Sequence, residues 1–231
     1  NFTFNRKYAF NWAFTKSLSL NYSSTVYALI DENIGEIGTK SNDEVIKENL
    51  KKFGRTRNYD QSITATYKLP LDKLPFTDWL SAETKYGTRY GWQAGTLGTS
   101  DTLGNTISNT REKGVNGKVD LLKLYNKVKF LKAINNPIPK PKPLPGDTTK
   151  PKPEYKLVKG IFKKLMMVKS VNISYTLTEG TSVPGFMPKV KYLGMENSDI
   201  RNIVGAPGLP FLIGSQDVEA FTREGINNNW F

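Results

Sequence analysis

The chain of 231 residues contains no cysteine and no histidine. The absence of cysteine excludes disulfide bonds, zinc–thiolate sites and catalysis by a thiol. The absence of histidine removes the commonest general base and the commonest metal ligand. The scattered carboxylates show no paired spacing that would suit acid–base chemistry. We therefore expect a protein that is not an enzyme and that holds no metal or cofactor.

Long apolar runs are also missing, since no stretch approaches the 18 consecutive apolar residues of a transmembrane helix. The first residues, 1–14, lack the basic start and apolar core of a signal peptide. The chain opens at Asn1 without a methionine and ends on Phe231, which suggests a processed product or a piece of a larger protein. Any role in a membrane would have to be carried by β-strands.

Strict alternation between residues 80 and 94 is the clearest pattern that is present. The even positions carry no charge, whereas the odd positions carry charges, amides and glycines. Because a strand turns alternate side chains to opposite faces, this segment has one neutral, aromatic-tipped face and one polar face. The segment also exceeds the roughly 9–11 residues that a tilted strand needs to cross a bilayer.

Similar alternation predicts about six strands in total, which occupy residues 2–14, 18–30, 59–69, 80–94, 107–119 and 171–178. The first two form a tight hairpin at 15–17. The connections at 31–58, with a short helix at 43–53, and at 95–106 are long, and that at 70–78 is short. Short turns at one end and long loops at the other are typical of a transmembrane barrel. A soluble β-sandwich could produce the same alternation.

Charge is concentrated in one segment, because residues 122–169 hold thirteen lysines against Asp147 and Glu154, a net of +11 in a chain of net +12. Seven of the thirteen prolines lie in the same segment. We predict a helix from 121 to 134, capped by Asp120, then an extended Pro/Lys-rich connector and a second helix at 155–167. These helices could bind anionic lipid, shield the periplasmic rim of a barrel, or dock cargo or a partner. Nucleic acid is disfavoured because arginine is scarce and no binding motif is present.

The predicted organisation has four parts. Residues 1–121 form five strands with their loops, 122–168 form the basic helices and connector, and 169–180 form the sixth strand. The segment 122–168 lies on the side of the short turns, which in a membrane barrel is the periplasmic side. The remaining 181–231 are rich in glycine and proline and read as an extracellular or lumenal loop region with at most a short helix at 215–222.

Several separate motifs resemble one family in the same order along the chain. These are Asn49–Tyr59, Tyr67–Pro75, Asp78–Trp79, Tyr90–Ala94, Leu103–Thr106, Lys123–Val128, Ala206–Gly208 and Gly214–Gln216. They resemble a segment of the SprA (Sov) family, the outer-membrane translocons of the type IX secretion system of Bacteroidota. The resemblance covers most of residues 49–231 and is weaker over the first strands. The Pro/Lys-rich insert departs from the family pattern, so its role stays open.

The resemblance implies an all-β membrane fold, in which this chain is a partial wall of a very large antiparallel transmembrane β-barrel, with short amphipathic helices and long loops. The implied function is export of folded cargo proteins across the outer membrane of a Gram-negative bacterium, a system also linked to gliding motility. The implied partners are the remainder of the same barrel polypeptide, the PorV shuttle protein, a plug protein, secreted cargo with a C-terminal signal, and outer-membrane lipid. Six strands are too few to close a barrel, so their edges must pair with that remainder.

In this interpretation one face of the fourth strand contacts lipid and the other contacts water. Lipid would meet Leu80, Ala82, Tyr86, Tyr90 and Trp92, and the water-filled lumen would meet Glu83, Lys85, Arg89 and Gln93. The alternative is a soluble cell-surface β-domain that binds carbohydrate or protein through Tyr86, Tyr90 and Trp92.

Overall fold

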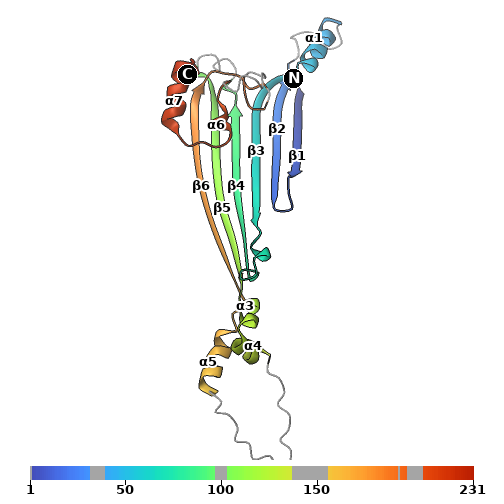
Figure 1. The fold of residues 1–231 in the computed structure, drawn as a ribbon. Coiled ribbons are helices and arrows are strands. Elements are labelled where there is room, and N and C mark those ends of the chain that lie inside the picture. The colour runs from blue at the N-terminus through green and yellow to red at the C-terminus, as the bar shows by residue number, and fades with distance from the viewer. Residues whose placement is uncertain (1, 32–39, 97–102, 137–155, 192, 197–204) are drawn as a thin grey trace, which may run out of the picture. The chain divides into compact units, whose positions relative to one another are not determined.

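The computed structural model describes residues 2–31, 40–96, 103–136, 156–191, 193–196 and 205–231. Its main feature is one six-stranded antiparallel sheet, in which the strands follow each other in the order β1-β2-β3-β4-β5-β6 (Figure 1). Each strand therefore pairs with its neighbours in sequence, as the alternating pattern predicts. The sheet is open, because β1 and β6 are its two edges.

The strands are long compared with the mode of about five or six residues in globular proteins. They comprise β1 (Phe2–Ala13), β2 (Leu18–Ile30), β3 (Arg55–Leu69), β4 (Leu80–Gln93), β5 (Asn105–Asp120) and β6 (Ser170–Phe186). The shortest has 12 residues and the longest has 17. The prediction of six antiparallel strands is confirmed.

The first hairpin forms where the sequence predicts it. The β1–β2 register pairs Phe2 with Ile30 at one end and Ala13 with Ser19 at the other. In the turn, the side-chain oxygen of Thr15 accepts hydrogen bonds from the backbone N–H groups of Ser17 and Leu18 at 3.2 and 3.0 Å. A short polar side chain thus satisfies the backbone donors that the turn leaves unpaired.

Helices are few and short. They are α1 (Lys40–Lys51), the 3₁₀ turn η1 (Leu71–Lys73), α3 (Leu121–Lys127), α4 (Lys129–Asn135), α5 (Lys156–Leu165), α6 (Leu209–Leu212) and α7 (Val218–Asn227). Among the described helices, none is both long enough and apolar enough to span a membrane.

The predicted helix at 121–134 begins where expected but is interrupted. Asp120 caps α3, because its carboxylate accepts a hydrogen bond from the backbone N–H of Lys123 at 3.1 Å. Val128 then has extended backbone angles, φ −86° and ψ 113°, and separates α3 from α4. The predicted Pro/Lys-rich connector lies largely at 137–155, outside the described residues.

Three strands are longer than the sequence predicts, and β5 is extended least, to Asn105–Asp120 from the predicted 107–119. β3 begins at Arg55 instead of residue 59, and β6 continues past Gly180 and Pro184 to Phe186. Proline lacks an N–H group and is tolerated on an edge strand, where that group has no partner in the sheet. β6 is such an edge.

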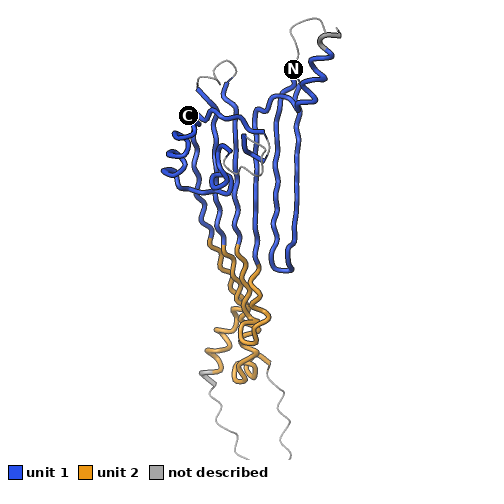
Figure 2. The backbone as a smooth tube through the Cα atoms, turned by 45° about the horizontal axis from the view of Figure 1, so that its top comes forward, with its two compact units in different colours: residues 1–67, 85–114, 176–231 blue, residues 68–84, 115–175 orange. Residues whose placement is uncertain are grey.

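The chain divides into two compact units (Figure 2). Unit 1 comprises residues 1–67, 85–114 and 176–231, and unit 2 comprises 68–84 and 115–175. Unit 1 contains the largest buried cluster in the described residues, in which Tyr90 and Ile107 are fully buried. Unit 2 contains the basic helices α3, α4 and α5, whose Phe130 and Phe162 rings meet edge to face at 5.6 Å.

Candidate functional site

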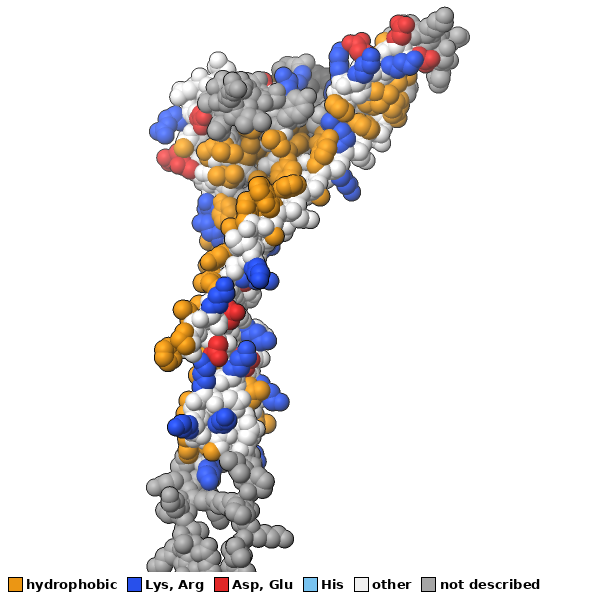
Figure 3. Space-filling model, turned by 45° about the vertical axis from the view of Figure 1, so that its right-hand side comes forward, with side chains coloured by type: hydrophobic (Ala, Val, Ile, Leu, Met, Phe, Trp, Pro, Cys, Tyr) orange, Lys and Arg blue, Asp and Glu red, His pale blue; other side chains and the backbone are white. Residues whose placement is uncertain are grey.

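The sheet of unit 1 has two chemically different faces. On one face, cross-strand rows join Phe10, Tyr22 and Ile63, and then Trp12, Leu20 and Ala65. We call this side the aromatic face. Figure 3 shows hydrophobic side chains gathered along it.

The opposite side, the polar face, carries hydroxyls, amides and charges. Its rows include Asn11 with Asn21 and Thr64, and Ala9 with Ser23 and Ser62. The period of two along each strand keeps these groups apart from the aromatic rows. Along these rows one side of the sheet is mainly apolar and the other is polar. Arg6 is an exception on the aromatic face, because it lies in the row of Val26 and Tyr59.

Over β1 the aromatic face is open. Tyr8, Phe10 and Trp12 are each about half exposed, at 52, 55 and 51%. Their rings contact each other along the strand, since Phe10 and Trp12 meet edge to face at 5.9 Å and Trp12 stacks on Phe14 at 4.3 Å. A row of exposed aromatic rings of this kind is unusual for a soluble monomer and is typical of a surface that contacts another protein, a ligand or a membrane.

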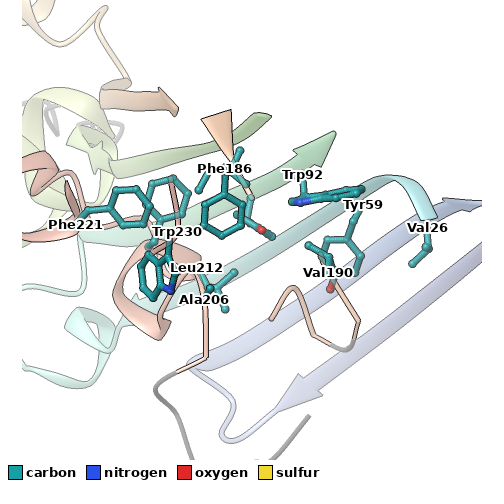
Figure 4. Close-up of a cluster of buried hydrophobic side chains, with 12 residues drawn as sticks. Val26, Tyr59, Trp92, Phe186, Val190, Ala206, Leu212, Phe221 and Trp230 are labelled. Atoms are coloured by element: carbon teal, nitrogen blue, oxygen red, sulfur yellow. The ribbon is translucent and has the colours of Figure 1, made fainter. Parts of the chain in front are cut away.

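Over β3, β4 and β5 the aromatic face is covered by the chain itself. The described residues of the stretch from Phe186 to Trp230, which are 186–191, 193–196 and 205–230, are called the C-terminal cover, and several of them form one buried cluster with Tyr59, Tyr90 and Trp92. Figure 4 shows Phe186, Val190 and Trp230 of the cover in this cluster with Tyr59 and Trp92. Tyr90 meets Phe211 edge to face at 6.1 Å, and it lies 6.1 Å from Tyr59.

The cover is held to the sheet by hydrogen bonds as well as by packing. The Tyr86 hydroxyl donates to the carbonyl oxygen of Ile213 at 2.8 Å, and the Trp92 indole N–H donates to that of Pro188 at 3.2 Å. The Asn105 amide donates to the carbonyl oxygen of Phe186 at 2.9 Å. These bonds join side chains of β4 and β5 to backbone carbonyl groups of the cover.

The predicted lipid-facing residues of β4 therefore separate into two groups. In unit 1, Tyr90 and Trp92 are 0 and 4% exposed beneath the cover. We correct the prediction for these two: their neighbours in this structure are protein groups, because the cover occupies the space that lipid would fill. Tyr86 is 38% exposed, and in unit 2 Leu80 and Ala82 are half-buried, so lipid contact by these three stays a prediction.

The predicted lumen-facing residues lie at the alternate positions of the same strand. Within unit 1, Lys85 forms an ion pair with Glu112 at 2.9 Å, while Arg89 and Gln93 are exposed. Gly87, between Lys85 and Arg89, lies against Glu112 and Thr64, which places this side of β4 on the polar face. Within unit 2, Glu83 lies 4.0 Å from Lys68. Contact of these groups with a lumen stays a prediction.

Sequence reasoning missed the cover. The predicted helix at 215–222 is displaced to Val218–Asn227, because the Asp217 carboxylate accepts a hydrogen bond from the N–H of Ala220 at 2.9 Å and so sets the start of α7. In the sequence, the apolar residues Phe211, Leu212 and Phe221 could have indicated that this segment is buried. Their spacing is interrupted by glycine and proline, which obscures any period.

Charged pairs fix two connections. At the end of β2, Asp31 accepts hydrogen bonds from the Arg55 guanidinium at 2.8 and 3.0 Å, and this lowers the pKa of the Asp31 carboxyl. In unit 2, a hydrogen bond from Lys127 lowers the pKa of Asp78 in the same way. Each carboxylate is stabilised in its charged form by a cation in contact with it.

No known protein family matches the chain, and no curated protein matches it either.

Proposed function

We propose that this chain is a segment of the wall of a protein-conducting outer-membrane β-barrel, which exports folded cargo proteins in a type IX secretion system. The observation that carries the proposal is the open aromatic face of β1 at the edge of an unclosed meander of long strands. The resemblance of the sequence motifs to the SprA family supplies the particular transport system.

Strand length supports a membrane-spanning wall. Each strand has 12–17 residues, whereas a tilted strand needs about 9–11 to cross the hydrocarbon layer. The excess leaves room for one end of the strands to stand outside that layer. We propose that the C-terminal cover occupies this outer part, so that lipid meets the aromatic face only where the cover leaves it open.

The two edges of the sheet support a larger assembly. β1 and β6 each pair with a single neighbour within the described strands, and exposed edges favour pairing with further strands. Because bacterial barrels need at least about eight strands, the proposal requires the remainder of the barrel polypeptide. The polar face, with Lys85 and Arg89, would then line a wet channel through which cargo passes.

The partners follow from the family resemblance. We propose that the PorV shuttle protein, a plug protein and cargo with a C-terminal signal act on this channel. The alternative function, a soluble module that stacks sugars on Tyr86, Tyr90 and Trp92, loses much of its surface, because two of these three rings are buried beneath the cover.

Single cysteines can test the lipid assignment, because residues 1–231 contain no cysteine of their own. Leu20→Cys and Asn21→Cys are adjacent on β2 and lie on opposite faces, as do Ile63→Cys and Thr64→Cys on β3. In intact envelopes of the producing cells, we expect a water-soluble maleimide to label positions 21 and 64 and to spare 20 and 63. All four should react after detergent extraction and unfolding.

Equal labelling of both faces in intact envelopes would overturn the membrane assignment. The export assignment has its own test, which is the fate of cargo in cells that lack this segment. We expect proteins with the C-terminal signal to accumulate in the periplasm, measured by fractionation and immunoblotting. Undiminished secretion would overturn export while leaving the membrane assignment in place.

A further inference from the structure

A cavity of about 630 Å³ lies in unit 1, on the side of the sheet that carries Trp92. Its wall is formed by β1, the start of β3, the turn after α1, the end of β4 and the chain that follows β6. This volume is within the range of about 300–1,000 Å³ typical of small-molecule sites.

The cavity wall is strongly basic. Seven of its side chains are cationic and, among the described residues that line it, none is acidic; the seven are Arg6, Lys51, Lys52, Arg55, Arg57, Lys189 and Lys191. They come from three separated parts of the sequence, so the fold brings together like charges that repel each other. An anion in the cavity would relieve this repulsion.

Only two of the seven have a carboxylate partner in the part of the chain that the structure describes. Arg55 is paired with Asp31 at 2.8 Å, and Lys52 with Glu48 at 2.6 Å. Arg57 donates to the carbonyl oxygen of Gly95 at 3.2 Å, which fixes its position but does not neutralise it. Among the described residues, most of the positive charge on the wall therefore has no carboxylate in contact with it.

Arg6 is held in place before any ligand arrives. Its guanidinium carbon lies 4.8 Å from the centre of the Phe53 ring and 5.8 Å from that of Phe4. Its Nε atom is buried without a hydrogen-bond partner among the described groups. Phe53 has a φ of +61°, in the left-handed region that is strained for a residue other than glycine. Strain of this kind is found at ligand clamps.

Another part of the wall is apolar. Trp92, Met187 and Val190 line it, and the Trp92 indole N–H is already satisfied by the carbonyl oxygen of Pro188 at 3.2 Å. This part offers a ring and aliphatic groups without a free donor. The cavity thus matches a ligand with an anionic head and an adjoining apolar part.

We propose that this cationic pocket binds the phosphate group of a small amphiphile, with the apolar part of the ligand against Trp92, Met187 and Val190. Arginine suits phosphate because its planar fork can donate two parallel hydrogen bonds to two oxygens. Three of the seven cations are arginines. The proposal is independent of the export function, because the pocket lies within unit 1 and needs no barrel.

The test is calorimetric titration of the 231-residue chain with four probes. They are octyl phosphate below its micellar concentration, inorganic phosphate, octanoate and octyl glucoside. We expect octyl phosphate to bind most tightly, inorganic phosphate and octanoate at least tenfold more weakly, and octyl glucoside not at all. Equal affinity for octyl phosphate and inorganic phosphate would overturn the apolar subsite, and equal affinity for octanoate would overturn the assignment to phosphate.

Two matched variants locate the site. Lys189→Gln/Lys191→Gln removes two exposed cations of the pocket, and Lys16→Gln/Lys113→Gln removes two exposed lysines elsewhere in unit 1. We expect the first to weaken octyl phosphate binding by at least tenfold, the scale of one charge-assisted hydrogen bond, and the second to leave it within twofold. Equal loss in both variants would mean non-specific attraction to net charge and would overturn the site. Unchanged melting temperatures without ligand establish that both variants fold.

Discussion

The side chain of Asn109, on β5, donates hydrogen bonds to the backbone carbonyl oxygen of Ser215 at 2.8 Å and to that of Phe211 at 3.0 Å. Its own carbonyl oxygen accepts from the Gln216 amide at 2.9 Å. Asn109 is only 2% exposed, and it lies more than a hundred residues before its partners. One buried amide therefore holds the C-terminal cover in register with the sheet.

Asn109→Ala should loosen the cover, because it leaves carbonyl groups of the cover buried with fewer donors. The expected loss is about 1–3 kcal/mol in the free energy of unfolding. Hydrogen–deuterium exchange should accelerate over residues 205–231 in the variant. Asn11→Ala, which truncates an exposed asparagine on β1, is the control and should change neither quantity.

Phe221→Ala should damage the cover through lost packing. The Phe221 ring lies 4.5 Å from Phe211 and 5.7 Å from Trp230, and the residue is 7% exposed. Truncating a buried phenylalanine typically costs about 3–5 kcal/mol. Ile226→Ala, on the same helix α7 but 65% exposed, should cost less than about 0.5 kcal/mol. Urea unfolding of both variants makes the comparison, and equal losses would mean that α7 does not pack as described.

Tyr90→Phe should be neutral or stabilising. The Tyr90 side chain is fully buried, and its hydroxyl has no hydrogen-bond partner among the described groups. Removing an unsatisfied buried hydroxyl removes a desolvation penalty of about 1–3 kcal/mol while keeping the ring in place. Thermal unfolding should show an equal or higher midpoint. A clear loss of stability would reveal that the hydroxyl is bonded in solution, and Tyr59→Phe, which removes a hydroxyl bonded to Gln61 at 2.9 Å, provides the opposite case.

The Asp31–Arg55 pair should make stability depend on acid pH. Hydrogen bonds from Arg55 lower the pKa of Asp31 below its ordinary value of 3.8, so the folded state binds its proton less readily than the unfolded state. The contribution is therefore fully present well above pH 3.8, and it is lost as pH falls through the lowered pKa. Asp31→Asn should destabilise the chain at pH 7 by about 0.2–1 kcal/mol, the range for exposed ion pairs.

Urea unfolding at a series of pH values checks this dependence. The difference between the natural chain and Asp31→Asn should shrink below pH 3.8 and vanish in stronger acid. A difference that stays constant down to that range would show that the hydrogen bonds, and not the charge of Asp31, carry the effect. Asp72→Asn, at an exposed position in unit 2, should show no comparable difference at pH 7.

The six strands could be predicted from the sequence because period-two alternation and turn residues are local signals. The hairpin at Thr15 and the cap at Asp120 depend on residues within three positions of each other. The ends of the strands were predicted less accurately, because the continuation of β6 past Pro184 depends on the place of β6 at the edge of the sheet. Edge position is a tertiary property and leaves no mark in a short window.

The candidate site was predictable only in part, for the same reason. Alternation separates the two faces of β4, and the structure keeps them separate. Alternation does not reveal what covers a face. Tyr90 and Trp92 therefore have the same sequence pattern as Tyr86, although the cover buries them. Likewise, the cationic pocket joins Arg6, Arg57 and Lys189, which no local pattern relates to one another.

The distance along the chain between β4 and its cover has a consequence for synthesis. The carbonyl of Ile213 that receives the Tyr86 hydroxyl is made 127 residues later. Until then the cover cannot bury the rings of Tyr90 and Trp92, and a ribosome that adds about 5–20 residues per second needs roughly 6–25 seconds to make the intervening 127 residues. In such an interval, partly folded chains with exposed aromatic strands can aggregate. A chaperone that binds these strands until the cover is made would prevent this aggregation.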